Sequence, residues 1–139
     1  MIILGLDYGR AHVGIALGAT ETALALPLAT ITYVAPDDLQ QRLVGLVHEH
    51  RVEHIVVGLP VTWPEDRSKP GMREEVESFA AQLRHSLRLP VTLVDERRTS
   101  RGAGELQRGG SRVDEHALAA ALILQTYLDQ EGRRQQPQG

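Results

Sequence analysis

The chain contains no cysteine among its 139 residues. Disulfides, zinc–thiolate centres and thiol nucleophiles are therefore excluded, and the composition fits a reducing compartment. No segment approaches the roughly 20 consecutive apolar residues of a membrane-spanning helix. The amino terminus has no basic region followed by a long apolar stretch, so we expect neither a signal peptide nor a membrane partner.

An excess of positive charge is also missing, because 15 lysines and arginines face 18 acidic residues and the net charge is −3. This balance argues against a broadly basic nucleic-acid binder, so any anion site must be local. No dinucleotide-binding or Walker motif is present. The length and the 42% hydrophobic content fit a single domain with a real core. We expect this domain over residues 1–130 and a frayed polar tail over residues 131–139.

The first fourteen residues predict a β-hairpin. An apolar run over Ile2–Leu6 ends at Asp7, a turn follows at Tyr8–Arg10, and a second apolar run occupies Val13–Leu17. The first run shows no sustained alternation, which indicates a strand buried on both faces. A buried carboxylate costs several kcal/mol unless it is paired or binds a metal. Asp7 must therefore have a cation nearby or lie at the rim of the sheet.

The rest of the pattern alternates helices with strands. Apolar residues at helical spacing indicate amphipathic helices, and short apolar runs bounded by Gly and Pro indicate strands. The order predicts an α/β fold with a five-stranded mixed sheet, antiparallel over the first three strands, parallel afterwards, and covered by helices on both faces. We expect strands at Leu24–Val34, His54–Leu59 and Pro90–Val94, helices at Ala35–His50, Gly71–Arg88, Thr99–Arg108 and Ser111–Gln130, and a polar loop at Thr62–Pro70.

Three acids stand where element ends are expected to meet. Asp7 ends the first strand, Glu96 follows the last strand, and Asp114 lies at the start of the final helix. Functional groups on such sheets gather at the carboxyl edge. Three converging carboxylates favour Mg²⁺ or Mn²⁺ over zinc, and a carboxylate-bound metal pair suits hydrolysis of a phosphodiester.

Each acid also has an ordinary structural explanation. Asp7 can form an Asx turn, and Glu96 can pair with a neighbouring arginine at the surface. Ser111 and Asp114 match a capping box in which Asp114 stands at the third helical position, where an acid also suits the helix dipole. No single acid is diagnostic, so the metal hypothesis depends on the set.

Basic residues are concentrated locally despite the negative net charge. Five of the fifteen lie between Arg97 and Arg112, directly after Glu96, and a smaller group lies near the polar loop. There they can hold phosphates, although a solvated helix face is the alternative. The candidate nucleic-acid contacts are Arg10, Arg67, Lys69, Arg97, Arg98, Arg101, Arg108 and Arg112.

Two further side chains have both a functional and a structural explanation. Trp63 in the polar loop can stack on an exposed base or anchor the loop by packing. His12 can contact phosphate or transfer a proton, or be a plain surface histidine. The other five histidines show no zinc-ligand spacing.

Four motifs carry a resemblance to the YqgF/RuvX family of small RNase H-like nucleases, which are related to RuvC-type Holliday-junction resolvases. They occur in the family's order from Ile3 to Leu128. The four motifs together are specific for the family, whereas the Asp-x-Gly element alone would be weak evidence. The motifs are Gly5-Leu6-Asp7-Tyr8-Gly9-Arg10 with Val13–Ala16, Val56–Pro60, Val94–Ser100, and Val113–Ala117 continuing to Ile123–Leu128.

The resemblance implies an RNase H-like fold with Asp7, Glu96 and Asp114 as catalytic metal ligands. It also implies a bacterial cytoplasmic nuclease, monomeric or homodimeric, that processes the 5′ end of precursor 16S rRNA. Cleavage of Holliday junctions or other branched or single-stranded DNA is an alternative, and so is a non-catalytic nucleic-acid-binding assembly factor. Nucleotide-binding proteins of the actin and sugar-kinase type also open with Asp-x-Gly, but they need two duplicated halves, and this chain has no internal repeat.

The chain departs from the family pattern at three places. Ala11-His12 follow Arg10, where the family often has two basic residues. Thr62–Asp66 stands in place of an Asn-Met-Asp-Gly-like turn, which leaves the substrate contacts of this loop open. Ala117 occupies the position of a fourth ligand in many RuvC-type enzymes. We therefore expect a leaner metal site.

Overall fold

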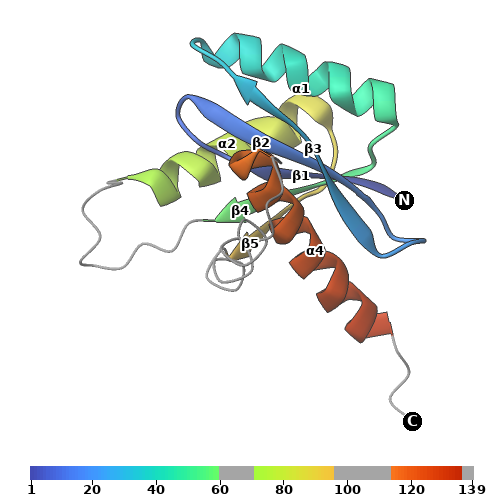
Figure 1. Ribbon diagram of the computed structural model, residues 1–139. Coiled ribbons are helices and arrows are strands. Elements are labelled where there is room, and N and C mark those ends of the chain that lie inside the picture. Colours follow the sequence, from blue (N-terminus) through green and yellow to red (C-terminus); the bar gives the residue numbers. More distant parts are fainter. Residues whose placement is uncertain (60–70, 96–113, 136–139) are drawn as a thin grey trace.

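A five-stranded mixed sheet forms the centre of the computed structural model, which describes residues 1–59, 71–95 and 114–135 (Figure 1). The strand order is β3-β2-β1-β4-β5, with β1, β2 and β3 antiparallel and β4 and β5 parallel to β1. This confirms the predicted mixed sheet. The strands are β1 (Ile2–Asp7), β2 (His12–Ala19), β3 (Leu24–Thr32), β4 (His54–Leu59) and β5 (Val91–Asp95), and the helices are α1 (Pro36–His50), α2 (Met72–Leu87) and α4 (Glu115–Gln135).

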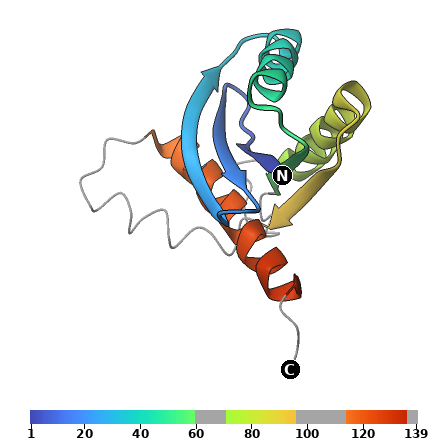
Figure 2. The ribbon, with the colours of Figure 1, turned by 90° about the vertical axis from the view of Figure 1, so that its right-hand side faces the viewer.

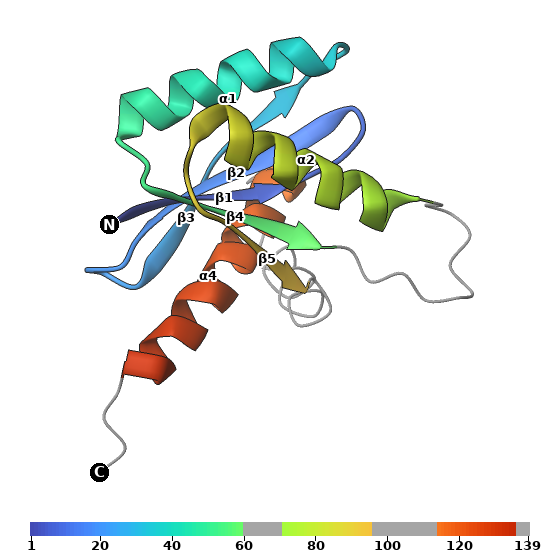
Figure 3. The same cartoon turned by 180° about the vertical axis from the view of Figure 1, so that it is seen from behind.

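Helices cover both faces of the sheet, as predicted. Figure 2 shows the sheet between α1 and α2 on one side and α4 on the other, and Figure 3 shows α1 and α2 from their own side. Strand β1 is buried on both faces because its side chains alternate. Leu4 and Leu6 belong to the core under α1 and α2, whereas Ile3 belongs to the core under α4.

Most elements begin and end close to the predicted residues, because Pro, Gly and charged residues end the runs. Strand β4 has the predicted bounds, and α1 begins at Pro36 with two acids in its first turn. Strand β3 ends at Thr32, two residues before the predicted Val34. Its partner β2 begins at His12, which pairs with Thr32, so no strand is available to continue the ladder.

The last helix differs from its prediction at both ends. It begins at Glu115 rather than Ser111 and continues to Gln135, five residues past the predicted end at Gln130. The expected tail from residue 131 is therefore wrong up to Gln135. Gly132 does not end the helix, since a single glycine costs only about 1 kcal/mol there. The predicted Thr99–Arg108 helix and Thr62–Pro70 loop lie outside the described residues.

None of the helices in the described parts of the chain combines the length and the apolar character needed to span a membrane.

Candidate active site

The carboxyl ends of the parallel strands lie at one edge of the sheet. Asp7 ends β1, Leu59 ends β4 and Asp95 ends β5, and the registers of β1 with β4 and of β4 with β5 place these ends side by side. Asp7 therefore lies at the edge where functional groups gather in such sheets. Glu96 directly follows Asp95 and lies outside the described residues.

The side chain of Asp7 belongs to the face that α4 covers. A Cβ added at Gly5 would lie 2.8 Å from the Cβ of Leu124 in α4, and Ile3 packs in the core on the same side. Because alternate residues of a strand share a face, Asp7 follows Ile3 and Gly5 toward α4.

Glycine opposite Asp7 lets the first turn of α4 approach the sheet. Asp7 pairs with Gly14 in the β1–β2 register. A Cβ at Gly14 would lie 1.8 Å from the carbonyl oxygen of His116, which leaves no room for any side chain. The start of α4 thus rests directly on the strand beside Asp7.

Asp114 caps this helix. Its Oδ1 accepts a hydrogen bond of 2.9 Å from the backbone N–H of His116, and its carbonyl oxygen accepts one of 2.9 Å from the N–H of Leu118. Asp114 is therefore the N-cap residue itself. The predicted capping box, with Asp114 at the third helical position after Ser111, is wrong because the helix begins at Glu115.

The capping bond keeps Asp114 ionised. The His116 N–H holds the pKa of the Asp114 carboxyl below its usual range, and the nearby hydroxyl of Thr30 lowers this pKa further. Oγ1 of Thr30 is itself buried without a hydrogen-bond partner of normal geometry among the described residues.

One row of residues connects the surroundings of the two acids. Asp7, Gly14 and Thr30 are register partners on β1, β2 and β3, on strands about 4.8 Å apart. Asp7 stands at one end of the row, and Thr30, whose hydroxyl influences the pKa of Asp114, stands at the other. Two of the three predicted acids therefore lie on the same side of the sheet, on either side of the contact between α4 and Gly14.

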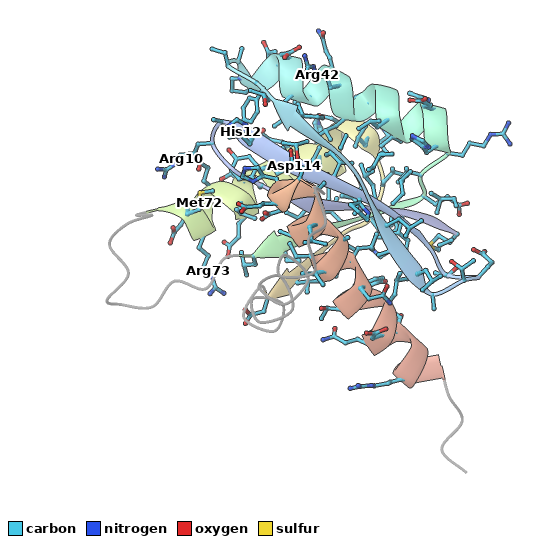
Figure 4. All side chains as sticks on the ribbon, viewed as in Figure 1. Arg10, His12, Arg42, Met72, Arg73 and Asp114 are labelled. Atoms are coloured by element: carbon cyan, nitrogen blue, oxygen red, sulfur yellow. The ribbon has the colours of Figure 1, made fainter. Side chains whose placement is uncertain are left out.

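Histidines flank the same place. The ring of His12 stacks on that of His116 with centroids 5.2 Å apart and planes 24° apart. Nδ1 of His12 also lies 3.0 Å from the hydroxyl oxygen of Thr32. Figure 4 shows His12 and Asp114 close together at the start of α4, with Arg10 beyond them. Both histidines lie on the surface, within reach of a ligand at the acidic edge.

The donor set fits a hard divalent cation. Asp7 and Asp114 supply carboxylate oxygens, the ligands that Mg²⁺ and Mn²⁺ prefer. Within the described ranges, no group of three or more His, Asp or Glu side chains is arranged to hold a metal ion. The third predicted ligand, Glu96, falls outside those ranges.

Arg10 is the predicted nucleic-acid contact that the structure describes. Its Nε lies 3.0 Å from Oε2 of Glu75 in α2, and both side chains are partly exposed. No pattern in the sequence indicates this partner, because an acid in a first helical turn already has an explanation in the helix dipole. The other predicted contacts and Trp63 lie outside the described residues, namely Arg67, Lys69, Arg97, Arg98, Arg101, Arg108 and Arg112.

Tyr33 supports the turn that follows Asp7. Its hydroxyl donates a hydrogen bond of 2.8 Å to the carbonyl oxygen of Gly9, and its ring is buried. Burial raises the pKa of the Tyr33 hydroxyl, so this group stays a proton donor. Sequence reasoning missed Tyr33, Gly14 and Thr30, because their importance follows from strand register and not from a motif.

Solved structures of Holliday-junction resolvases share this fold. The RuvC of Thermus thermophilus, in complex with a Holliday junction substrate, matches with a TM-score of 0.64 over 95% of this chain and 96% of that chain, at 16% identity. At that identity the match shows the fold alone, and it confirms the predicted RNase H-like architecture.

Sequence comparisons place the chain more narrowly. A protein of Chloroflexus aurantiacus named "Putative pre-16S rRNA nuclease" is 37% identical over 98% of this chain and 90% of its own length. A protein of the same name from Rickettsia conorii is 34% identical over 91% of this chain and 85% of its own length. The family model described as RuvX, Holliday junction resolvase, matches residues 1–130. The predicted resemblance is thus confirmed, and the chain belongs to the RuvX family.

Proposed function

We propose that this protein is a divalent-metal-dependent nuclease that hydrolyses phosphodiester bonds at the edge formed by Asp7 and Asp114. The observation that carries the proposal is the close approach of α4 to Gly14, which brings the start of a helix capped by Asp114 onto the strand residue that pairs with Asp7. A cation held by both carboxylates would offset the repulsion between two like charges on the same side of the sheet.

Each residue of the proposed active site has a distinct role. Asp7, Asp114 and, after β5, Glu96 would hold Mg²⁺ or Mn²⁺. When bound there, the metal supplies an activated water and stabilises charge on the leaving oxygen. The His116 N–H fixes one oxygen of Asp114, which orients the other for binding. His12 and Arg10 lie where a phosphate backbone would pass.

The proposed substrate is precursor 16S rRNA, cut at its 5′ end in the bacterial cytoplasm. The names of the relatives from Chloroflexus and Rickettsia support this choice. The arginines between Arg97 and Arg112 would hold its phosphates, which makes binding sensitive to salt.

A second candidate substrate is a branched DNA junction. The family model's description and the likeness to RuvC favour it. A nucleic-acid-binding assembly factor without catalysis is the remaining alternative, and it predicts binding of the same substrates without any cleavage.

One assay separates these candidates. Labelled precursor rRNA fragments, duplex DNA and a four-way DNA junction are each incubated with the protein in Mg²⁺, in Mn²⁺ and in EDTA. We expect metal-dependent cleavage of the rRNA fragment near its 5′ end and none in EDTA. Preferential cutting of the junction would move the assignment to the second candidate, and binding without cleavage in any metal would refute the nuclease proposal.

A further inference from the structure

A cavity of about 180 Å³ lies behind the turn that follows Asp7, on the face of the sheet opposite to α4. Its walls come from the β1–β2 turn, the connection from β3 into the start of α1, and the Glu75–Gln82 part of α2. Aromatic side chains form much of the lining. The rings of Tyr8 and Phe79 have centroids 4.6 Å apart and planes 37° apart, and the ring of Tyr33 completes the aromatic part.

The polar part of the lining contains a group without a partner. Gln40 lines the cavity beside Ser78 and Gln82. Oε1 of Gln40 is buried and accepts no hydrogen bond from any described residue. Leaving a buried acceptor unsatisfied is costly, and an N–H group of a ligand in the cavity would satisfy this oxygen once the side-chain amide turns toward it. The terminal amide torsion of glutamine is soft, which lets the oxygen turn toward an incoming N–H group.

The cavity and the acidic edge are connected by consecutive residues of the chain. Tyr8 directly follows Asp7, and alternation along the strand sends Asp7 toward α4 and Tyr8 toward α1 and α2. Glu75, which lines the cavity, also pairs with Arg10. A nucleic-acid strand crossing the edge would therefore meet carboxylates on one face, a guanidinium at the turn, and the aromatic cavity on the other face.

We propose that this cavity takes one unpaired nucleobase, next in the strand to the phosphate held at the edge of Asp7 and Asp114. The proposal rests on the proposed function and narrows its substrate to nucleic acid that is single-stranded at the cut. Aromatic stacking suits the face of a base, and Gln40 can accept from an N–H on its edge. The volume is below the 300–1,000 Å³ or so of pockets for drug-sized ligands, which suits a single ring system.

The first test needs no protein variant. A single abasic residue is moved along a labelled single-stranded RNA, and the affinity of the unsubstituted protein is measured by fluorescence anisotropy in Ca²⁺, a cation that carboxylates bind, with a gel to confirm that the RNA stays intact. We expect the loss of one particular base to weaken binding roughly 5- to 100-fold, the range for one stacked base. An equal effect at every position, or no measurable binding of single-stranded RNA, would overturn the proposal.

The second test assigns that base to the cavity. Gln40→Leu removes the acceptor without leaving a polar group buried, so the fold should be at least as stable. We expect it to weaken binding of the intact RNA about 2- to 10-fold. The loss of affinity caused by removing the sensitive base, the abasic penalty, should become smaller by the same factor. Gln41→Leu, at the exposed neighbouring position, should change neither. Tyr8→Leu should reduce the penalty further, and Tyr8→Phe should retain it.

The outcomes distinguish this inference from the proposed function. If the protein cleaves nothing but shows a position-specific abasic penalty that Gln40→Leu and Tyr8→Leu reduce, base binding in the cavity is supported and the nuclease proposal is refuted. Metal-dependent cleavage by a protein whose affinity is indifferent to abasic position supports the nuclease and refutes the cavity. A penalty that neither variant reduces places the base elsewhere and refutes the proposal.

Discussion

Gly14 of β2 and His116 of α4 touch so closely that a Cβ at Gly14 would lie 1.8 Å from the carbonyl oxygen of His116. Two residues before His116 stands Asp114, and directly across from Gly14 stands Asp7. The missing side chain is therefore what allows a helix from the end of the chain to bring its N-cap to a strand from the beginning.

We expect Gly14→Ala to displace the first turn of α4. The added methyl group meets backbone and not a flexible side chain, so the helix itself must move, at a cost of about 1–3 kcal/mol for overpacking. The rate of cleavage should fall strongly although the protein still folds, because the displaced helix moves Asp114 relative to Asp7. Chemical denaturation and the rRNA cleavage assay measure both effects.

Gly45→Ala is the matched control for this prediction. Gly45 lies in the middle of α1 with no atom within 4 Å of its Cβ position. Alanine there should raise stability by about 0.5–1 kcal/mol and leave cleavage unchanged. A Gly14→Ala protein with normal stability and activity would show that α4 does not position Asp114.

We expect Asp114→Asn to retain the helix-capping role of this residue and to remove its negative charge. Asparagine caps a helix as well as aspartate, so the free energy of unfolding should fall only by about 0.3–1 kcal/mol from the lost helix-dipole interaction. Cleavage should fall by orders of magnitude, and stabilisation by Mn²⁺ should be lost. Thermal melts with and without Mn²⁺, beside a cleavage assay, measure these quantities.

Two controls accompany this variant. Asp114→Ala removes cap and charge together, and should cost a further 0.5–2 kcal/mol or so. Asp37→Asn removes an exposed acid from the first turn of α1, on the face of the sheet opposite to α4, and should leave cleavage intact. If Asp114→Asn remains active and still responds to Mn²⁺, the residue is a cap alone.

His54 should make the protein less stable in mild acid. Its ring is buried, with Nε2 at 2.8 Å from Oγ1 of Thr92 and the edge of the ring against Tyr127. Burial lowers the pKa of His54 below its usual 6.5. Just below pH 6.5 the unfolded chain therefore binds more protons at His54 than the folded protein does. The free energy of unfolding is unaffected by this group above that pH, and it decreases as the pH falls below it.

Urea denaturation at pH 7.5 and pH 5.5 measures this loss. We expect His54→Gln to show a smaller fall in the free energy of unfolding between the two pH values than the unsubstituted protein. His48→Gln, at an exposed position of α1, is the control and should preserve the full fall. An equal fall in all three proteins would contradict the assignment to His54.

Neutralising Glu75, which pairs with Arg10, should strengthen binding of nucleic acid. Both side chains are partly exposed, so Glu75→Gln should change stability by less than about 1 kcal/mol while removing a carboxylate that competes with phosphate for the guanidinium. Arg10→Gln should instead reduce the slope of log affinity against log salt by about one. Glu77→Gln, which breaks the similar pair with Arg73, is the control. Unchanged slopes in all variants would show that Arg10 does not contact phosphate.

The sequence by itself determined the elements and the candidate acids. Local periodicity placed β4 at His54–Leu59, its observed range, and α1 at Ala35–His50, one residue before its observed start at Pro36. The apolar spacing of an element and the residues that end it lie within the element itself. The same local signals put Asp7 at the end of a strand buried on both faces. The final helix was placed less well, because an N-cap and a lone glycine near a helix end are weak signals.

Tertiary structure alone decided which residues face one another. Strand register pairs Gly14 with Asp7, and helix packing places the start of α4, with its cap Asp114, against Gly14. Neither relationship has a local signal in the sequence. The pair of Arg10 with Glu75 and the unsatisfied oxygen of Gln40 arise in the same way. Register and packing join segments that are far apart in the chain, so the spacing of residues within any one segment does not encode them.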